Sequence, residues 1–244
     1  MKSEQAGATD APRDTNAAES LTADRRRFLR AAGLGGLALA LPGVLAACAK
    51  DLAGPTMLGA AGNADIRQSA TVTLDFSSDV GVLNYAYALE QLEAAFYVMA
   101  IASPYAGMSA SEQRLLTDVR DHEVVHRDFF AAALGSAKIP NLTPDFSAVD
   151  FTNRRSVLKT AKAFEDLGVA AYNGAARYLK SERYLIVAGK IVSVEARHAA
   201  AIRDLLEPRT SLFAPDAFDN AFSPTTVLAA ADPFIVDTIT AINT

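Results

Sequence analysis

Apolar residues recur with the period of an α-helix along four long segments of the chain. The capping box Ser109-x-x-Glu112 and the glycine at 135 mark the start and the end of the second segment, and Asn153 is the candidate N-cap of the third. Pro208 bounds the fourth. The predicted helices span residues 79–102, 109–134, 154–180 and 182–207.

The lengths of the connections predict the topology. The link over residues 135–153 contains Pro140 and Pro144 and lacks periodicity, whereas the other two links are short. Helices of about 25 residues are roughly 37 Å long, and an extended segment covers that distance in roughly 11 residues. Short links force antiparallel neighbours. The pattern therefore predicts an all-α four-helix bundle of two antiparallel hairpins joined by one long crossover.

Segments on either side of the bundle have different compositions. Residues 49–75 are rich in Ala, Gly and Thr and show no strong strand pattern, so we expect a flexible tether there. The C-terminal extension contains an expected loop at 215–222 and expected short helices from Thr225 and Pro233. It either covers an end of the bundle or mediates self-association as a homo-oligomer. The predicted organisation is an export signal at 1–47, a tether at 48–75, the bundle at 76–207 and the extension at 208–244.

Charged residues occur on the apolar faces of the predicted helices. Glu195 lies in one stripe with Ile191 and Ile202, and Glu90 lies in another with Leu83. Burying a charge is costly unless it is paired or bound to metal. Counting along the helices places one glutamate or one Glu-x-x-His pair from each helix at mid-bundle height. These candidate metal ligands are Glu90, Glu123, His126, Glu165, Glu195 and His198.

The composition of this set predicts the kind of metal. Four carboxylates and two neutral imidazoles balance the charge of two divalent cations. Oxygen-rich ligands with two imidazoles suit iron or manganese better than calcium, zinc or copper. The residues do not distinguish iron from manganese.

These motifs resemble those of the ferritin-like di-metal carboxylate family, specifically the exported, desiccation-associated type. The resemblance covers about residues 75–207 and rests on the stretch 89–97, on Phe164-Glu165 and on the two Glu-x-x-His motifs. It implies a ferritin-like fold in which Glu123 and Glu195 bridge two ions. Glu90 with His126, and Glu165 with His198, would complete the individual sites.

Several residues near the predicted ligands have more than one interpretation. Glu93 is a competitor of Glu90 on the same helix, and aligning the first helix with the third pairs Glu90 with Glu165 but Glu93 with Gly168. We therefore favour Glu90 as the ligand and expect Glu93 to contact a ligand or to be solvated. His122 is turned about 100° from Glu123, so we expect it to be partly exposed or to support a ligand.

Two tyrosines and a lysine are also close in sequence to these ligands. Tyr97 and Tyr172 each follow a lone glutamate by seven residues. They either hydrogen-bond to a carboxylate, donate electrons or pack in the core, and packing is the favoured interpretation. Lys162 either neutralises a carboxylate or extends to the surface, which is more common.

The first 47 residues resemble a twin-arginine export signal. Arg25 and Arg26 precede the uncharged, glycine-rich stretch 31–47, which is short for a membrane span and is interrupted by Pro42. A transmembrane helix is the alternative interpretation. Such a signal directs export and does not itself anchor the protein in a membrane.

The single cysteine, Cys48, directly follows Leu45-Ala46-Ala47, which resembles a bacterial lipobox. A lone cysteine forms no internal disulfide. We expect lipidation of Cys48, membrane attachment through this lipid anchor and a periplasmic or cell-envelope location. An incidental buried cysteine is the alternative.

The overall charge limits the expected partners. The chain carries 23 basic and 28 acidic residues, a formal net charge of −5, and no basic face is visible, so nucleic acid is not an expected partner. The resemblance implies a reaction with dioxygen or peroxide in oxidative or desiccation stress, as an oxidase, a ferroxidase or a peroxide-reducing enzyme. The alternative is a non-catalytic, lipid-tethered stress protein in which the metal site is structural or vestigial. Iron storage in a closed cage is a weaker third interpretation.

Overall fold

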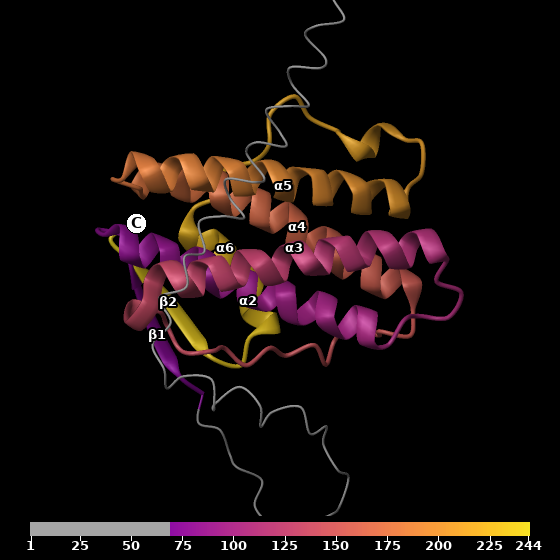
Figure 1. The fold of residues 1–244 in the computed structure, drawn as a ribbon, viewed down its shortest axis with the longest axis horizontal. Coiled ribbons are helices and arrows are strands. Elements are labelled where there is room, and N and C mark those ends of the chain that lie inside the picture. The colour runs from indigo at the N-terminus through magenta and orange to yellow at the C-terminus, as the bar shows by residue number, and fades with distance from the viewer. Residues whose placement is uncertain (1–68) are drawn as a thin grey trace, which may run out of the picture. The chain divides into compact units, whose positions relative to one another are not determined.

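The computed structural model describes residues 69–244 and confirms the all-α helical bundle. Four long helices form two antiparallel hairpins, and the crossover between the hairpins runs along the bundle (Figure 1). Both the export signal predicted at 1–47 and the lipidation site predicted at Cys48 lie outside the described residues. The long helices are α2 (Asp79–Ala102), α3 (Ala110–Leu134), α4 (Arg154–Ala175) and α5 (Glu182–Leu206).

Local sequence signals fix the ends of these helices as predicted. The Ser109 side chain accepts a hydrogen bond from the backbone of Glu112, whose carboxylate accepts one from the backbone of Ser109. Gly135 ends α3 with a φ of +54°, a value that favours glycine. The Asn153 side chain caps the start of α4. Helix α4 ends earlier than expected, at Ala175, because the chain tightens there into a 3₁₀ turn, η2 (Ala176–Tyr178).

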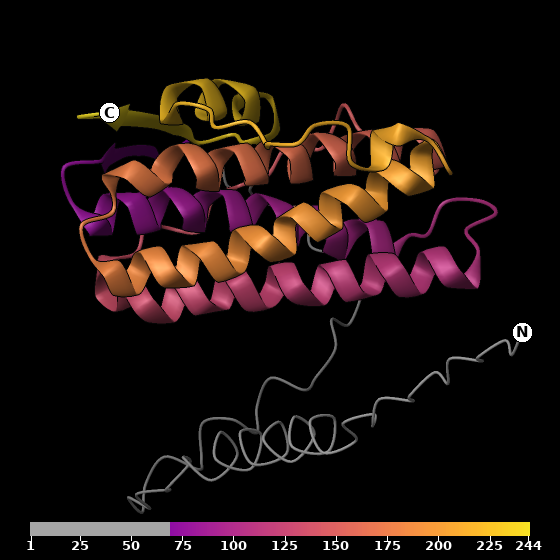
Figure 2. The same cartoon turned by 90° about the horizontal axis from the view of Figure 1, so that it is seen from above.

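The extension after α5 packs onto the bundle instead of projecting from it. It contains α6 (Pro224–Ala231), which packs against α4 (Figure 2). The short helix expected from Thr225 is therefore present. The helix expected from Pro233 is instead a single 3₁₀ turn followed by a strand. Besides η2, the 3₁₀ turns are η1 (Gly135–Ala137), η3 (Ser211–Phe213) and η4 (Asp232–Phe234) among the described residues.

A two-stranded parallel sheet was not predicted. Strand β1 (Thr71–Asp75) pairs with β2 (Thr238–Ile242) with Thr71 opposite Thr238. The tether predicted over 48–75 therefore includes a strand at its end. Asp237 reinforces the pairing because its carboxylate accepts hydrogen bonds from the backbone of Ala70 at 2.8 Å and of Thr143 at 2.6 Å.

Two glycines permit close contacts between these parts. A β-carbon at Gly81 would lie 1.8 Å from the carbonyl oxygen of Asp75, and one at Gly174 would lie 1.8 Å from that of Phe222. The first contact joins α2 to the end of β1, and the second joins α4 to the segment that follows α5.

In the described part of the chain, no helix is long and apolar enough to cross a membrane.

Candidate metal centre

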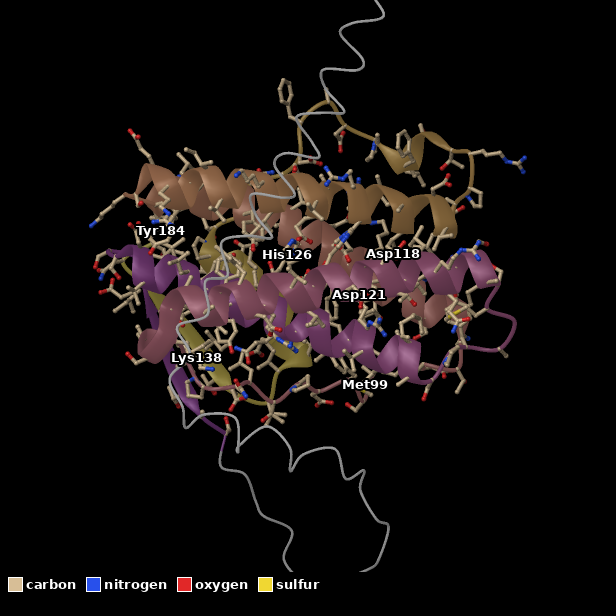
Figure 3. The ribbon with its side chains drawn as sticks, viewed as in Figure 1. Met99, Asp118, Asp121, His126, Lys138 and Tyr184 are labelled. Atoms are coloured by element: carbon tan, nitrogen blue, oxygen red, sulfur yellow. The ribbon has the colours of Figure 1, made fainter. Side chains whose placement is uncertain are left out.

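The six predicted ligands meet in the interior of the bundle. Helices α2 and α4 each supply one glutamate, and α3 and α5 each supply a Glu-x-x-His pair, in which the two side chains share one helix face. The four glutamates are fully buried, and only about 5% of His198 is exposed. The His126 side chain is 12% exposed, and Figure 3 shows it near the middle of α3. Residues that are distant in sequence thus form a single polar cluster in an apolar core.

The cluster divides into two overlapping groups of four residues. Within each group, ligand-type atoms lie within 4.8 Å of one another. The distance from His126 Nδ1 to Glu195 Oε1 is 2.9 Å, and that from His198 Nδ1 to Glu123 Oε1 is 2.8 Å. The groups are Glu90, Glu123, His126 and Glu195, and Glu123, Glu165, Glu195 and His198. Glu123 and Glu195 belong to both groups, so these two carboxylates are placed to bridge two ions.

The hydrogen bonds of the cluster distinguish bridging from terminal carboxylates. Apart from the close His–Glu ion-pair contacts, several buried atoms make no hydrogen bond among the described residues, which in a native protein calls for an explanation such as a bound ion. Both oxygens of each shared glutamate are unpaired, whereas each of the other two glutamates has one unpaired oxygen. The unpaired atoms are Glu90 Oε2, Glu123 Oε1 and Oε2, His126 Nδ1, Glu165 Oε2, Glu195 Oε1 and Oε2, and His198 Nδ1.

Two buried tyrosines account for the remaining carboxylate oxygens. The Tyr97 hydroxyl on α2 donates to Glu165 Oε1 on α4, and the Tyr172 hydroxyl on α4 donates to Glu90 Oε1 on α2, both at 2.5 Å. The sequence analysis favoured simple packing for these tyrosines, and that interpretation is wrong. Each hydroxyl orients the carboxylate of the opposite helix and leaves its second oxygen free.

The charges of the cluster affect its protonation. Burial raises the pKa of Glu90 well above its usual value and that of Glu165 to about 8. Although burial alone would lower them, the adjacent carboxylates raise the pKa of His126 and of His198 to about 12. In the absence of an ion, both imidazoles are therefore protonated at neutral pH and partly balance the carboxylates. A metal ion would have to displace these protons.

Glu93 is a fifth carboxylate close to the centre. Its side chain is buried but lies outside both groups of four. Burial, followed by the charges of Glu123 and Glu195, raises its pKa well above the usual value. A β-carbon at Gly168 would lie 3.0 Å from Glu93 Oε1, so the glycine provides the space that this carboxylate occupies. The alternative that Glu93 is solvated is wrong.

His122 contacts the centre from outside. Its Nδ1 lies 2.8 Å from Nε2 of His198, the nitrogen that points away from the carboxylates, and the two rings stack at 12°. The exposed His122 therefore supports a candidate ligand, as one of its two interpretations predicted. A histidine that binds metal through one nitrogen commonly donates a hydrogen bond from the other. His122, Glu123 and His126 also match the H-E-x-x-H zinc pattern, but His122 belongs to neither group of four.

The remaining sequence candidate is peripheral. Lys162 donates to Asp166 at 2.6 Å, and its side chain is 44% exposed, so the surface interpretation is the correct one.

The residues present fit a pair of first-row metal ions. Oxygen ligands predominate, each group contains one imidazole nitrogen, and two shared carboxylates join the groups. Four carboxylates with two neutral imidazoles match the charge of two divalent cations.

Comparisons with known proteins agree with this geometry. The model of the ferritin-like domain family matches residues 78–208, which is more than half of the chain and includes all six candidate ligands. No curated protein matches the chain. The chain therefore belongs to the ferritin-like domain family.

Proposed function

We propose that this protein holds two iron or manganese ions between its four long helices and reacts with dioxygen or peroxide. The observation that supports this most strongly is the set of unpaired, buried ligand atoms that converge on one space. Two such ions supply two electrons, which with two protons reduce dioxygen to peroxide or peroxide to water.

The chain's own residues hold and orient this centre. Tyr97 and Tyr172 fix the two terminal carboxylates, so that each presents a single oxygen. His122 fixes the ring of His198. The raised pKa values of Glu165, about 8, and of the two histidines, about 12, make these groups the expected source of the protons released when ions bind.

Metal content is the first test. Purified protein loaded with Fe(II) or Mn(II) and then desalted should retain about two ions per chain by elemental analysis. Glu195→Gln should lower this content because it replaces a shared carboxylate with a neutral amide. Glu182→Gln, which changes an exposed glutamate of the same helix, is the matched control and should retain both ions. Equal metal content in the two variants would contradict the proposed site.

Reactivity is the second test. Anaerobic Fe(II)-loaded protein should oxidise on mixing with dioxygen or with hydrogen peroxide, and the change is followed by absorption spectroscopy. Glu90→Gln should slow this reaction while the circular dichroism spectrum keeps its helical form. If the loaded protein reacts with neither oxidant, the metal has only a structural role and the non-catalytic interpretation holds.

We also propose that the protein is exported and attached to the cell-envelope membrane through a lipid on Cys48, with a role in oxidative or desiccation stress. The support is the resemblance of residues 25–48 to a twin-arginine lipoprotein signal. Wild-type protein produced in a bacterium should fractionate with membranes, and Cys48→Ser should be released into the soluble fraction. Membrane association that survives this substitution would contradict the lipid anchor.

A further inference from the structure

An apolar cavity of about 30 Å³ lies inside the bundle, in the half where α2 and α5 begin and α3 and α4 end. Its position follows from small side chains that leave space between the helices. Five alanines from three helices and the turn after α4 line it, namely Ala86, Ala171, Ala175, Ala176 and Ala188.

The opposite half of the bundle is packed differently. There, Phe96 of α2 and Phe164 of α4 meet edge to face at 5.2 Å, and Phe146 of the crossover packs against Phe96 at 5.8 Å. All three rings are buried. The core is therefore filled by aromatic rings on one side of the candidate metal centre and incompletely filled on the other.

The cavity and the candidate metal centre share a contact with Tyr172. Tyr172 lines the cavity, and its hydroxyl donates to Glu90 Oε1. Leu89, the residue before Glu90, also lines the cavity. A molecule in this space would therefore contact Tyr172, whose hydroxyl is bonded to a candidate ligand.

The side of the cavity closest to solvent lies between α3 and α5. Phe129 of α3 is 39% exposed, and the lining residues Tyr184, Val187 and Ala188 of α5 are half-buried. Figure 3 shows Tyr184 near the start of α5, at the end of the bundle. Movement of these few side chains would admit a small molecule.

The lining favours an apolar occupant over water or peroxide. A buried water needs two to four polar partners. Tyr172 already donates its hydroxyl to Glu90, and the Tyr85 hydroxyl is the one buried lining group without a partner among the described residues. A space of roughly 10–15 Å³ accommodates one water-sized probe, so the cavity has room for a diatomic molecule.

From this geometry we infer that the cavity is a binding site for dioxygen, which it holds beside the Tyr172 and Glu90 face of the centre. The inference rests on the function proposed above and makes dioxygen, not peroxide, the oxidant that the fold accommodates. No bond is made or broken in this step. The cavity raises the local concentration of an apolar reactant near the ligands.

Xenon tests the binding site independently of any metal chemistry, because dry apolar cavities take up this gas. Crystals of wild-type protein under xenon pressure should show a xenon atom among the five alanines. Ala175→Leu should abolish it, and Ala188→Leu, at the half-buried side, serves if the first variant fails to fold. Ala133→Leu, at an exposed position of α3, is the matched control and should retain xenon. Absence of xenon from wild-type crystals would overturn the inference.

Oxidation rates then test whether the cavity delivers dioxygen to the candidate metal centre. In Fe(II)-loaded protein, Ala175→Leu or Ala188→Leu should slow the reaction with dioxygen by about tenfold and leave the reaction with hydrogen peroxide within about twofold of wild type. If both reactions slow equally, or if neither slows, the preference for dioxygen is overturned. Suppose that the protein binds xenon but reacts with neither oxidant. The proposed function would then be refuted, and with it the delivery of dioxygen to the centre. The cavity would remain a site for small apolar molecules.

Discussion

Individual side chains decide which atoms of the centre are free to bind. Glu90 and Glu123 are both fully buried, yet only Glu90 receives a tyrosine hydroxyl. Burial alone therefore does not assign roles to the carboxylates. The hydrogen-bond partner does, because an oxygen that accepts a short hydrogen bond is less available to an ion.

The histidines predict how metal binding depends on pH. His126 and His198 have pKa values near 12, far above the usual 6.5, so each contributes stability to the metal-free protein that is fully present below pH 6.5 and is lost as pH rises toward 12. Metal displaces these protons. Apparent affinity for Mn(II) should therefore rise between pH 6 and pH 8, by about tenfold per pH unit for each proton displaced.

Competition with a chelator of known pH dependence measures this affinity, and a pH indicator in weakly buffered solution measures the protons released. Affinity that does not change over this range, with no proton release, would show that the imidazoles are already neutral in the metal-free protein.

The sequence predicted the cluster of buried Glu and His residues better than it predicted their hydrogen-bond partners. Each of the six candidate ligands is a charged or imidazole group on an apolar helix face, and the pattern occurs twice, so periodicity is enough to find them. The bonds from Tyr97 to Glu165 and from Tyr172 to Glu90 cross between helices. They depend on side-chain rotamers and on the distance between α2 and α4. Neither can be read from the sequence of one helix.

Among the elements, α4 depends on one small residue, Gly174. Gly174→Ala would place a β-carbon 1.8 Å from the carbonyl oxygen of Phe222, whose own backbone N–H donates to Ala170. The alanine is the better helix former, but a backbone atom has to move. We expect a loss of about 1–3 kcal/mol in the free energy of unfolding, measured by urea denaturation.

Gly189→Ala in α5 is the control. No atom lies within 4 Å of the β-carbon that it would add, and the position is exposed. It should stabilise the protein by up to about 1 kcal/mol through helix propensity alone. If Gly174→Ala also stabilises, the segment before α6 moves away from α4 without cost.

The four long helices were predicted, whereas the two strands were not. Caps such as Ser109 and Asn153 act within a few residues, so their effect is visible in the sequence. Each strand has five residues, and the partner of Thr71 is Thr238. A strand this short, whose partner lies at the far end of the chain, gives too weak a local signal. The predicted tether includes β1 for that reason.

At the scale of the whole molecule, the centre connects helices that otherwise pack mainly in pairs. The ligands come from all four long helices, so an ion that binds only the folded state should raise its stability. At a free concentration of about 100 times Kd, one ion contributes about 2.7 kcal/mol. Adding Mn(II) should raise Tm in calorimetry, and a chelator should reverse the rise. Glu195→Gln should show a smaller shift, and an equal shift would place the ions elsewhere.

The pairing of β1 with β2 determines when, during synthesis, the sheet can form. β1 precedes every described helix, and β2 follows every one of them. A ribosome makes β2 after all of these helices, so this contact forms only after they have been synthesised. The helices can associate earlier, but the sheet closes only once β2 has been made.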